Sequence, residues 1–515
     1  MTAMPLSDRK DPSWMKRIFR RLVLILLLLV LALIGPPLLF LANVWWHDCE
    51  APLPLGGAGT GDVSRLGRNT PAEVIALPPD PATAERQLVA LVQRASAEKL
   101  KISVSGARHS MGGHTFYPGG IVLDTLPFDH MSLDERTRLL TVGAGARWSE
   151  IIPYLDRHGM AVKVMQAYDD FTVGGSLSVN CHGWQNDLPP IASTVESFRL
   201  LTASGDVVRC SRTENSELFS LALGGYGLFG VILDATLRVV PNETYVAEAH
   251  RVKPADYRRL YDQLTRGRDD IGLAYGRISV APDSFFEDGI LTLLRRAPGN
   301  APPAAGTLVA APPPLLNRLV FRGSVGSDYG KNLRWRLETA IGEQRGRLSS
   351  RNQLMREPSS LYANTDPAAT EVLHEYFIPA ARLEEFIAKA RPVLLRHRPD
   401  LLNVTVRNVK ADPDTLLRYA PEDVFGLVFL FHQRRDAAAD AAMQALTRDL
   451  IDVALACGGR YYLPYRPHAT AEQFRRTYPE AAEFFARKRH YDPDGIFSNN
   501  FYLNYGKAFE PAAGE

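Results

Sequence analysis

Two glycine-rich segments place the strongest constraint on how this chain folds. They cover residues 101–124 (KISVSGARHSMGGHTFYPGGIVLD) and 171–184 (FTVGGSLSVNCHGW). In each, a short β-rich stretch breaks into glycines and small polar residues, which let the backbone approach a large anionic ligand closely. Backbone N–H groups in such turns can point at a pyrophosphate, and serine hydroxyls add further donors. Together the two segments predict a cradle for a dinucleotide.

The two segments are part of an ordered series of motifs between about residues 70 and 241. A Gly-x-x-His-Ser turn is followed by PGGIVLD, LLTVGAGARWSEI, TVGG with a Cys-His-Gly, LLTASGDVV and LFSLALGGYGLFGVILDATLRVVP. This order resembles the FAD-binding domain of the vanillyl-alcohol oxidase and p-cresol methylhydroxylase superfamily, the PCMH type. Within it, the chain is most similar to aldonolactone and alditol oxidases and to flavin oxidases of lipid-linked pentoses. The resemblance implies an oxidoreductase with FAD as its cofactor.

The resemblance also implies a set of cofactor-binding residues. In the alditol and aldonolactone oxidases, the histidine of the equivalent turn is bonded to the flavin 8α methyl, so His109 would be an attachment point for covalent FAD. By itself, a turn histidine is more often hydrogen-bonded to backbone or water, and a glycine-rich turn is often only a core turn. The other residues expected to bind FAD are Ser105, Gly106, Ala107, Arg108, Ser110, Gly113, Thr172, Val173, Gly174, Gly175, Val179, Asn180, Cys181, His182, Gly230, Val231 and Tyr462.

Other cofactor motifs are excluded by their context. The sequence GYGLFG at residues 225–230 matches GxGxxG, but it follows a helical pattern and precedes a strand, the reverse of an NAD-binding fingerprint. The four cysteines show no CxxC and no metal-ligand spacing, so we expect no metal site and four isolated, buried thiols. A formal net charge of +2 gives no reason to expect nucleic acid as a partner.

The N-terminus predicts a membrane anchor. Six basic residues precede an uncharged run, Leu22–Ala42, whose 21 residues reach about 30 Å as a helix, the thickness of the hydrocarbon core. We expect a cytoplasmic basic segment (1–21), a single transmembrane helix (22–44) in the inner cell membrane and the catalytic body outside the cytoplasm. A cleaved signal and a twin-arginine export signal at Arg20–Arg21 are the alternatives.

The rest of the chain predicts an α+β protein of several parts. A linker rich in glycine and proline (45–68) leads to the FAD-binding domain (69–241), which has two subdomains in the family. Residues 242–457 are expected to form an α+β substrate or cap domain, an antiparallel sheet over the flavin ring. Residues 458–515 are expected to return to the flavin site.

The catalytic residues are expected in the sequence GGRYYLPYRPH at residues 458–468. Relatives that act on lipid-linked pentoses have a lysine where Tyr465 stands and a flavin-contacting tyrosine at Tyr462. We expect Tyr465 or His468 to accept a proton, although a tyrosine can do so only if its pKa falls below its usual value of about 10. Arg466 would stabilise negative charge on the flavin or substrate. A purely structural polar strand is the alternative.

These observations predict the oxidation of a CH–OH group by hydride transfer to flavin N5. The substrate would be a sugar, an alditol, an aldonolactone or a lipid-linked sugar, and the electron acceptor either dioxygen or a quinone. Three alternatives stay open: a flavoprotein similar to sterol Δ24-reductases that acts on a C=C bond, a non-catalytic membrane-tethered scaffold, and an electron-transfer module.

Overall fold

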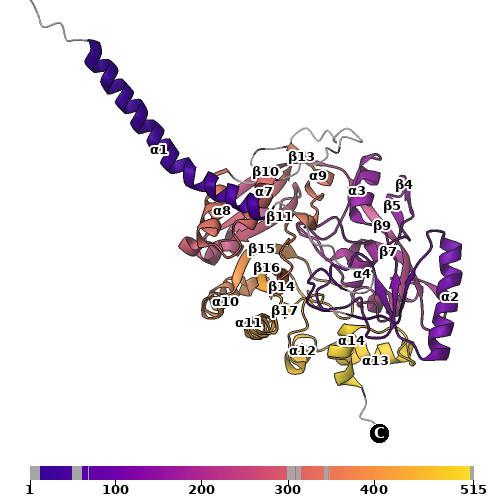
Figure 1. The fold of residues 1–515 in the computed structure, drawn as a ribbon. Helices are drawn as coiled ribbons and strands as arrows, with labels where there is room; N and C mark the ends of the chain where they lie inside the picture. The colour runs from indigo at the N-terminus through magenta and orange to yellow at the C-terminus, as the bar shows by residue number, and fades with distance from the viewer. Residues whose placement is uncertain are drawn as a thin grey trace, which may run out of the picture.

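Three β-sheets with flanking helices form the body of the protein, and one long helix extends from it (Figure 1). This computed structural model describes residues 12–48, 61–67, 69–297, 308, 315–341, 346 and 348–510. The predicted mixture of helices and sheets is confirmed. Most of the expected linker, Cys49 and residues 1–11 of the basic segment lie outside the described residues. The three described cysteines, Cys181, Cys210 and Cys457, are free and buried, as expected.

The smallest sheet carries the first glycine-rich segment. Its three parallel strands are, in order, β1 (Glu73–Ala76), β3 (Ile121–Asp124) and β2 (Ile102–Ser105). Helix α2 (Pro81–Glu98) starts at Asp80, whose side chain accepts a hydrogen bond from the Thr83 N–H, and it packs an alanine and leucine face against these strands. The first glycine-rich turn begins where β2 ends, so the sheet fixes its position.

The second sheet is antiparallel and has six strands. Its order is β4 (Met131–Asp134), β5 (Leu139–Gly143), β9 (Val231–Pro241), β7 (Val195–Leu201) and β8 (Val207–Ser211), with β6 (Met160–Val162) also paired to β9. Helices α3 (Trp148–Asp156), α4 (Val173–Ser178) and α5 (Ser216–Ala222) accompany it. The side chain of Trp148 is fully buried, and its Nε1 donates to Ser176 of α4, which ties the second glycine-rich segment to this core.

The largest sheet has eight antiparallel strands. They are, in order, β13 (Leu348–Ser350), β10 (Thr244–Val252), β12 (Gly289–Arg296), β11 (Ile271–Ile278), β15 (Asp400–Val409), β16 (Val424–Arg434), β14 (Ala369–Pro379) and β17 (Arg460–Tyr461). Six helices belong to this part of the chain: α6 (Tyr257–Thr265), α7 (Leu315–Arg322), α8 (Asp328–Ile341), α9 (Arg351–Leu354), α10 (Leu383–His397) and α11 (Ala437–Ala456). Helices α10 and α11 pack together and bury apolar faces on the sheet.

The C-terminal segment returns to the first sheet. After β17 it forms α12 (Ala471–Thr477), α13 (Ala481–Tyr491) and α14 (Asn500–Tyr505). Between α13 and α14, the Ile102 N–H of β2 donates to the Ile496 carbonyl at 2.7 Å, and the Ser498 N–H donates to the Ile102 carbonyl at 3.0 Å. The end of the chain is therefore hydrogen-bonded to the strand that carries the first glycine-rich turn.

Helix α1 (Pro12–His47) extends from the body as a single rod (Figure 1). It is long and apolar enough to cross a membrane, with a mean hydropathy of 3.0 over its most apolar window and no burial of that window in the body. The two prolines inside it, Pro36 and Pro37, do not end the helix.

Candidate active site

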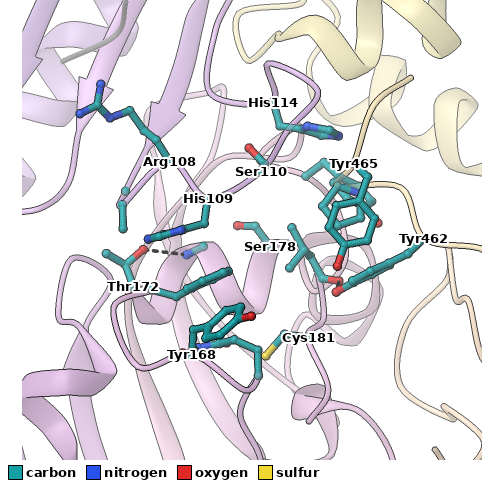
Figure 2. A pocket seen from close by; sticks show the side chains of 18 of the residues that line it. Arg108, His109, Ser110, His114, Tyr168, Thr172, Ser178, Cys181, Tyr462 and Tyr465 are labelled. Atoms are coloured by element: carbon teal, nitrogen blue, oxygen red, sulfur yellow. Dashed lines mark hydrogen bonds between the residues drawn. The ribbon is translucent and has the colours of Figure 1, made fainter. Parts of the chain in front are cut away.

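A large cavity lies between the two glycine-rich segments and the eight-stranded sheet. Its empty space is about 1500 Å³ when its open mouth is included. Figure 2 shows His109 and Thr172 on one side of the cavity and Tyr462 and Tyr465 on the other. The expected site residues that line it are Gly106, Ala107, Arg108, His109, Ser110, Thr172, Gly174, Gly175, Val179, Cys181, His182, Gly230, Tyr462 and Tyr465.

The two glycine-rich segments touch at Gly106 and Thr172. A Cβ atom at position 106 would lie 2.2 Å from the Thr172 hydroxyl oxygen. The Thr172 hydroxyl also accepts a hydrogen bond from the Gly175 N–H at 3.3 Å, which fixes the start of α4. A glycine is therefore needed at position 106 for the two segments to meet.

His109 is held in one orientation beside the cavity. Its ring stacks on Phe171, with centroids 4.0 Å apart and an interplanar angle of 9°. Its Nε2 lies 3.8 Å from a carboxylate oxygen of Asp170. Burial lowers the pKa of His109 below its usual value, an effect partly offset by Asp170. The imidazole is therefore neutral at neutral pH, the form with a nitrogen lone pair free to form a bond.

Five of the residues expected to bind FAD are not among those that line the cavity: Ser105, Gly113, Val173, Asn180 and Val231. Asn180 shows why. Its side-chain amide donates to Asp412 at 2.8 Å and its oxygen accepts from the Ala192 N–H at 3.1 Å. These hydrogen bonds hold the side chain of Asn180 away from the cavity. Its backbone φ is 50°.

Arg466 and His468 also lie outside the cavity lining, contrary to expectation. After β17 the chain turns toward α11, where Arg466 pairs with Asp440 at 3.0 Å. His468 is 2% exposed, its Nδ1 lies 2.9 Å from the Thr447 hydroxyl, and burial lowers its pKa. Both side chains therefore face α11 in this structure.

Tyr465 faces the cavity but is unsuited to be a base. Burial raises its pKa well above the usual value, and the negative charge of Glu375 adds to the shift. Its hydroxyl lies 3.3 Å from a carboxylate oxygen of Glu375. In this arrangement Tyr465 stays protonated and is placed to donate a hydrogen bond to Glu375. Tyr462 donates its hydroxyl to the Val179 carbonyl at 2.7 Å.

Glu375 is a cavity residue that the sequence analysis missed. It projects from the middle of β14 and is 2% exposed. Its second carboxylate oxygen lies 2.7 Å from Nε2 of His182, which is 4% exposed. The two side chains form a buried pair in the cavity wall. A glutamate inside the apolar stretch LHEYFIP was the available signal, because a buried carboxylate in a strand needs a partner.

Several polar side chains of the cavity wall have atoms without a hydrogen-bond partner among the described residues. They include the hydroxyls of Ser110 and Thr115 and Nε of Arg407. Buried polar atoms usually have partners, so these atoms suit a ligand rich in donors and acceptors. The close contact of the glycine segments and this polar lining fit FAD.

Comparison with known proteins agrees with this chemistry. The FAD binding domain family matches residues 81–211. This match and the relatives together support a PCMH-type FAD-dependent oxidoreductase. FAD is the cofactor of this flavoprotein.

Three relatives show how far the similarity extends. Decaprenylphosphoryl-β-D-ribose oxidase of Mycolicibacterium smegmatis is 25% identical over 443 residues, covering 80% of this chain and 91% of the relative. An uncharacterised oxidoreductase of the fasciation locus of Rhodococcoides fascians is 33% identical over 201 residues, 38% of this chain and 42% of the relative. L-galactono-1,4-lactone dehydrogenase of Arabidopsis thaliana is 30% identical over 171 residues, 32% of this chain and 28% of the relative. The flavoprotein thus matches less than half of the length of two of these three relatives.

Replacing Gly106 by alanine is expected to destabilise the flavoprotein by about 1–3 kcal/mol and to reduce its FAD content, because the new methyl group would overlap the Thr172 hydroxyl. Thermal unfolding and the absorbance ratio of flavin to protein measure the two effects. Gly67→Ala is the control, since a Cβ there meets nothing within 4 Å. Equal behaviour of the two variants would contradict the contact.

His114 is expected to destabilise the folded protein in acid. Burial lowers its pKa to about 4, whereas in the unfolded chain it is about 6.5. The unfolded state therefore binds more protons between these values, so stability falls as the pH drops through this window, by up to about 3 kcal/mol. His114→Gln should show a smaller loss of melting temperature between pH 7 and pH 4 than the wild type. An identical loss would exclude this contribution.

Proposed function

We propose that this flavoprotein oxidises a CH–OH group of a sugar, an alditol, an aldonolactone or a lipid-linked sugar. The observation that carries the proposal is the buried His182–Glu375 pair in the wall of the cavity that also holds the His109 turn. A carboxylate with a histidine 2.7 Å away is a suitable acceptor for a hydroxyl proton. The printed names of the relatives include a lipid-linked ribose oxidase and sugar-lactone enzymes, which supports this substrate range.

The proposed reaction assigns a step to each group. Bound FAD supplies a hydride acceptor, the N5 atom of its ring. With FAD bound, the hydride of the substrate C–H bond would be taken up by that acceptor, and the His182–Glu375 pair would accept the hydroxyl proton as the C=O bond forms. Tyr465 donates a hydrogen bond to Glu375 or to the substrate oxygen, because its raised pKa keeps it protonated. Arg407 provides positive charge in the same wall.

We also propose that His109 is bonded covalently to the flavin 8α methyl. Its neutral, stacked imidazole at the cavity wall supports this role. The bond replaces one imidazole N–H and one methyl C–H by an N–C bond. The two protons and two electrons released leave with dioxygen as hydrogen peroxide. Asp170 would orient the ring through its oxygen 3.8 Å away.

The proposed organisation follows the expected boundaries. Residues 69–241 would bind FAD in two subdomains, 242–457 would cover the flavin, and 458–515 would complete the site. Helix α1 would anchor the protein in the inner membrane as one span, with the catalytic body outside the cytoplasm and either dioxygen or a membrane quinone as the electron acceptor.

A substrate panel tests the proposal. Purified full-length protein would be mixed without oxygen with alditols, aldonolactones and polyprenyl-phosphate pentoses, and bleaching of the visible flavin band would be recorded. Bleaching by at least one class, with formation of the matching carbonyl product, is the expected result. A flavoprotein bleached by a reduced nicotinamide and recoloured by an alkene would be a C=C reductase instead.

A further inference from the structure

Helix α1 is joined to the body well before its C-terminal end. Its residues are exposed from Trp14 to Ile34, and partly covered side chains then recur on one face. Those residues are Pro37, Phe40, Leu41, Val44 and, just after the helix, Asp48. From Pro37 to Asp48 the contact extends about 17 Å along the helix axis.

This face of α1 packs against the corner between α7 and α8. The Phe40 ring packs edge to face on Tyr329, with centroids 5.1 Å apart. It also lies against Gly323 and Gly330, where an added Cβ would come within 2.8 Å and 3.1 Å of the ring. Asp48 closes the contact, because its carboxylate lies 2.8 Å from Arg318 and 3.5 Å from Arg322 of α7. These contacts fix α1 to the α7–α8 corner.

If α1 spans the membrane, its contact with the α7–α8 corner determines how deep in the lipid bilayer that corner lies. The exposed apolar part before the contact, Leu22–Ile34, has 13 residues and reaches only about 20 Å, too short for a hydrocarbon core of about 30 Å. The core must therefore include residues as far as about Ala42, where Phe40 already touches Tyr329 and Gly330. The α7–α8 corner lies at the same level as the outer part of the core.

We infer that the α7–α8 corner is a membrane-contact surface that rests in the outer face of the lipid bilayer. Its exposed apolar side chains agree with this position, since Leu316 is 62% exposed and Tyr329 is 46% exposed. The inference rests on the membrane anchoring in the proposed function.

The surface lies next to the cavity wall. Phe321 of α7 packs with Leu402 and Leu430, and Leu430 lines the cavity. Contact of α7 with lipid would therefore bring this apolar end of the cavity close to the bilayer.

Depth measurements on the full chain in phosphatidylcholine and phosphatidylglycerol nanodiscs test the inference. With Cys49 replaced by serine, single cysteines at Leu33, Leu316 and Leu395 would carry an environment-sensitive fluorophore, and lipids with nitroxide on the acyl chain would quench it. Leu395 of α10 is a matched control because it is 49% exposed and lies outside the corner. We expect strong quenching at Leu316 and Leu33 and several-fold weaker quenching at Leu395.

The outcomes separate the inference from the anchoring that it assumes. Quenching at Leu33 with none at Leu316 would overturn the membrane-contact surface and leave the anchor intact. Absence of quenching at Leu33 would overturn the anchor, and the inference with it. A shielded but unquenched label at Leu316 would mean that protein, such as a second copy of the chain, covers α7, and would also overturn the inference.

Discussion

Replacing Glu375 by glutamine is expected to lower the rate constant of flavin reduction by about a thousandfold, a loss of about 4 kcal/mol of transition-state stabilisation. The change preserves the shape of the side chain but removes the carboxylate that lies 2.7 Å from His182. FAD content should stay at the wild-type level, because the effect is on proton acceptance. Anaerobic stopped-flow reduction and the flavin-to-protein ratio measure the two quantities.

Two further variants make the Glu375 result specific. Tyr465→Phe removes the hydroxyl 3.3 Å from Glu375 but keeps the His182–Glu375 pair, so we expect a loss of about tenfold or less. Glu248→Gln changes a partly exposed glutamate of the same sheet outside the cavity and should leave the rate unchanged. A Glu375→Gln enzyme that retains its rate within a few-fold would rule out Glu375 as part of the proton acceptor.

Replacing His109 by alanine is expected to abolish covalent attachment of the flavin. In the wild type, the yellow colour should stay with the protein after acid precipitation, since the proposed N–C bond survives unfolding. In His109→Ala, all of the flavin should appear in the supernatant. Absorbance of the two fractions, together with the mass of the intact protein, measures the attached fraction.

The control for His109 is His158→Ala. His158 lies in the turn just after α3, its side chain is 32% exposed, and it does not line the cavity. It should keep the wild-type fraction of attached flavin. Flavin found in the supernatant of the wild type would contradict the bond at His109 and leave a non-covalent flavoprotein.

The FAD cradle was predictable from the sequence because its chemistry is local. The glycines and serines around His109 lie close together in the chain, as do those around Thr172. Their spacing therefore indicated a common ligand. Helix α1 was predictable for the same reason, since its apolar character is continuous in sequence.

The proposed proton-accepting pair was not predictable in this way. Glu375 and His182 are far apart in the chain and meet only because β14 of the large sheet faces the loop after α4. Arg466 and His468 were predicted to be catalytic because they follow Tyr465 in the sequence. The chain turns after Tyr465, so that Arg466 pairs with Asp440 and His468 contacts Thr447, both on α11. The direction in which the Arg466 and His468 side chains point could not be predicted from their nearness to Tyr465 in the sequence.

The rate of flavin reduction by a deuterated substrate tests whether hydride passes from a CH–OH carbon to the flavin. The full-length protein would be mixed without oxygen with the alcohol that bleaches its flavin most rapidly, and with the same alcohol deuterated at the carbinol carbon. We expect flavin reduction to be several-fold slower with the deuterated alcohol than with the undeuterated one, because the C–H bond breaks as its electrons pass to the flavin. Failure of every sugar alcohol and lactone to reduce the flavin, in protein that holds FAD and is reduced by a nicotinamide, would contradict it.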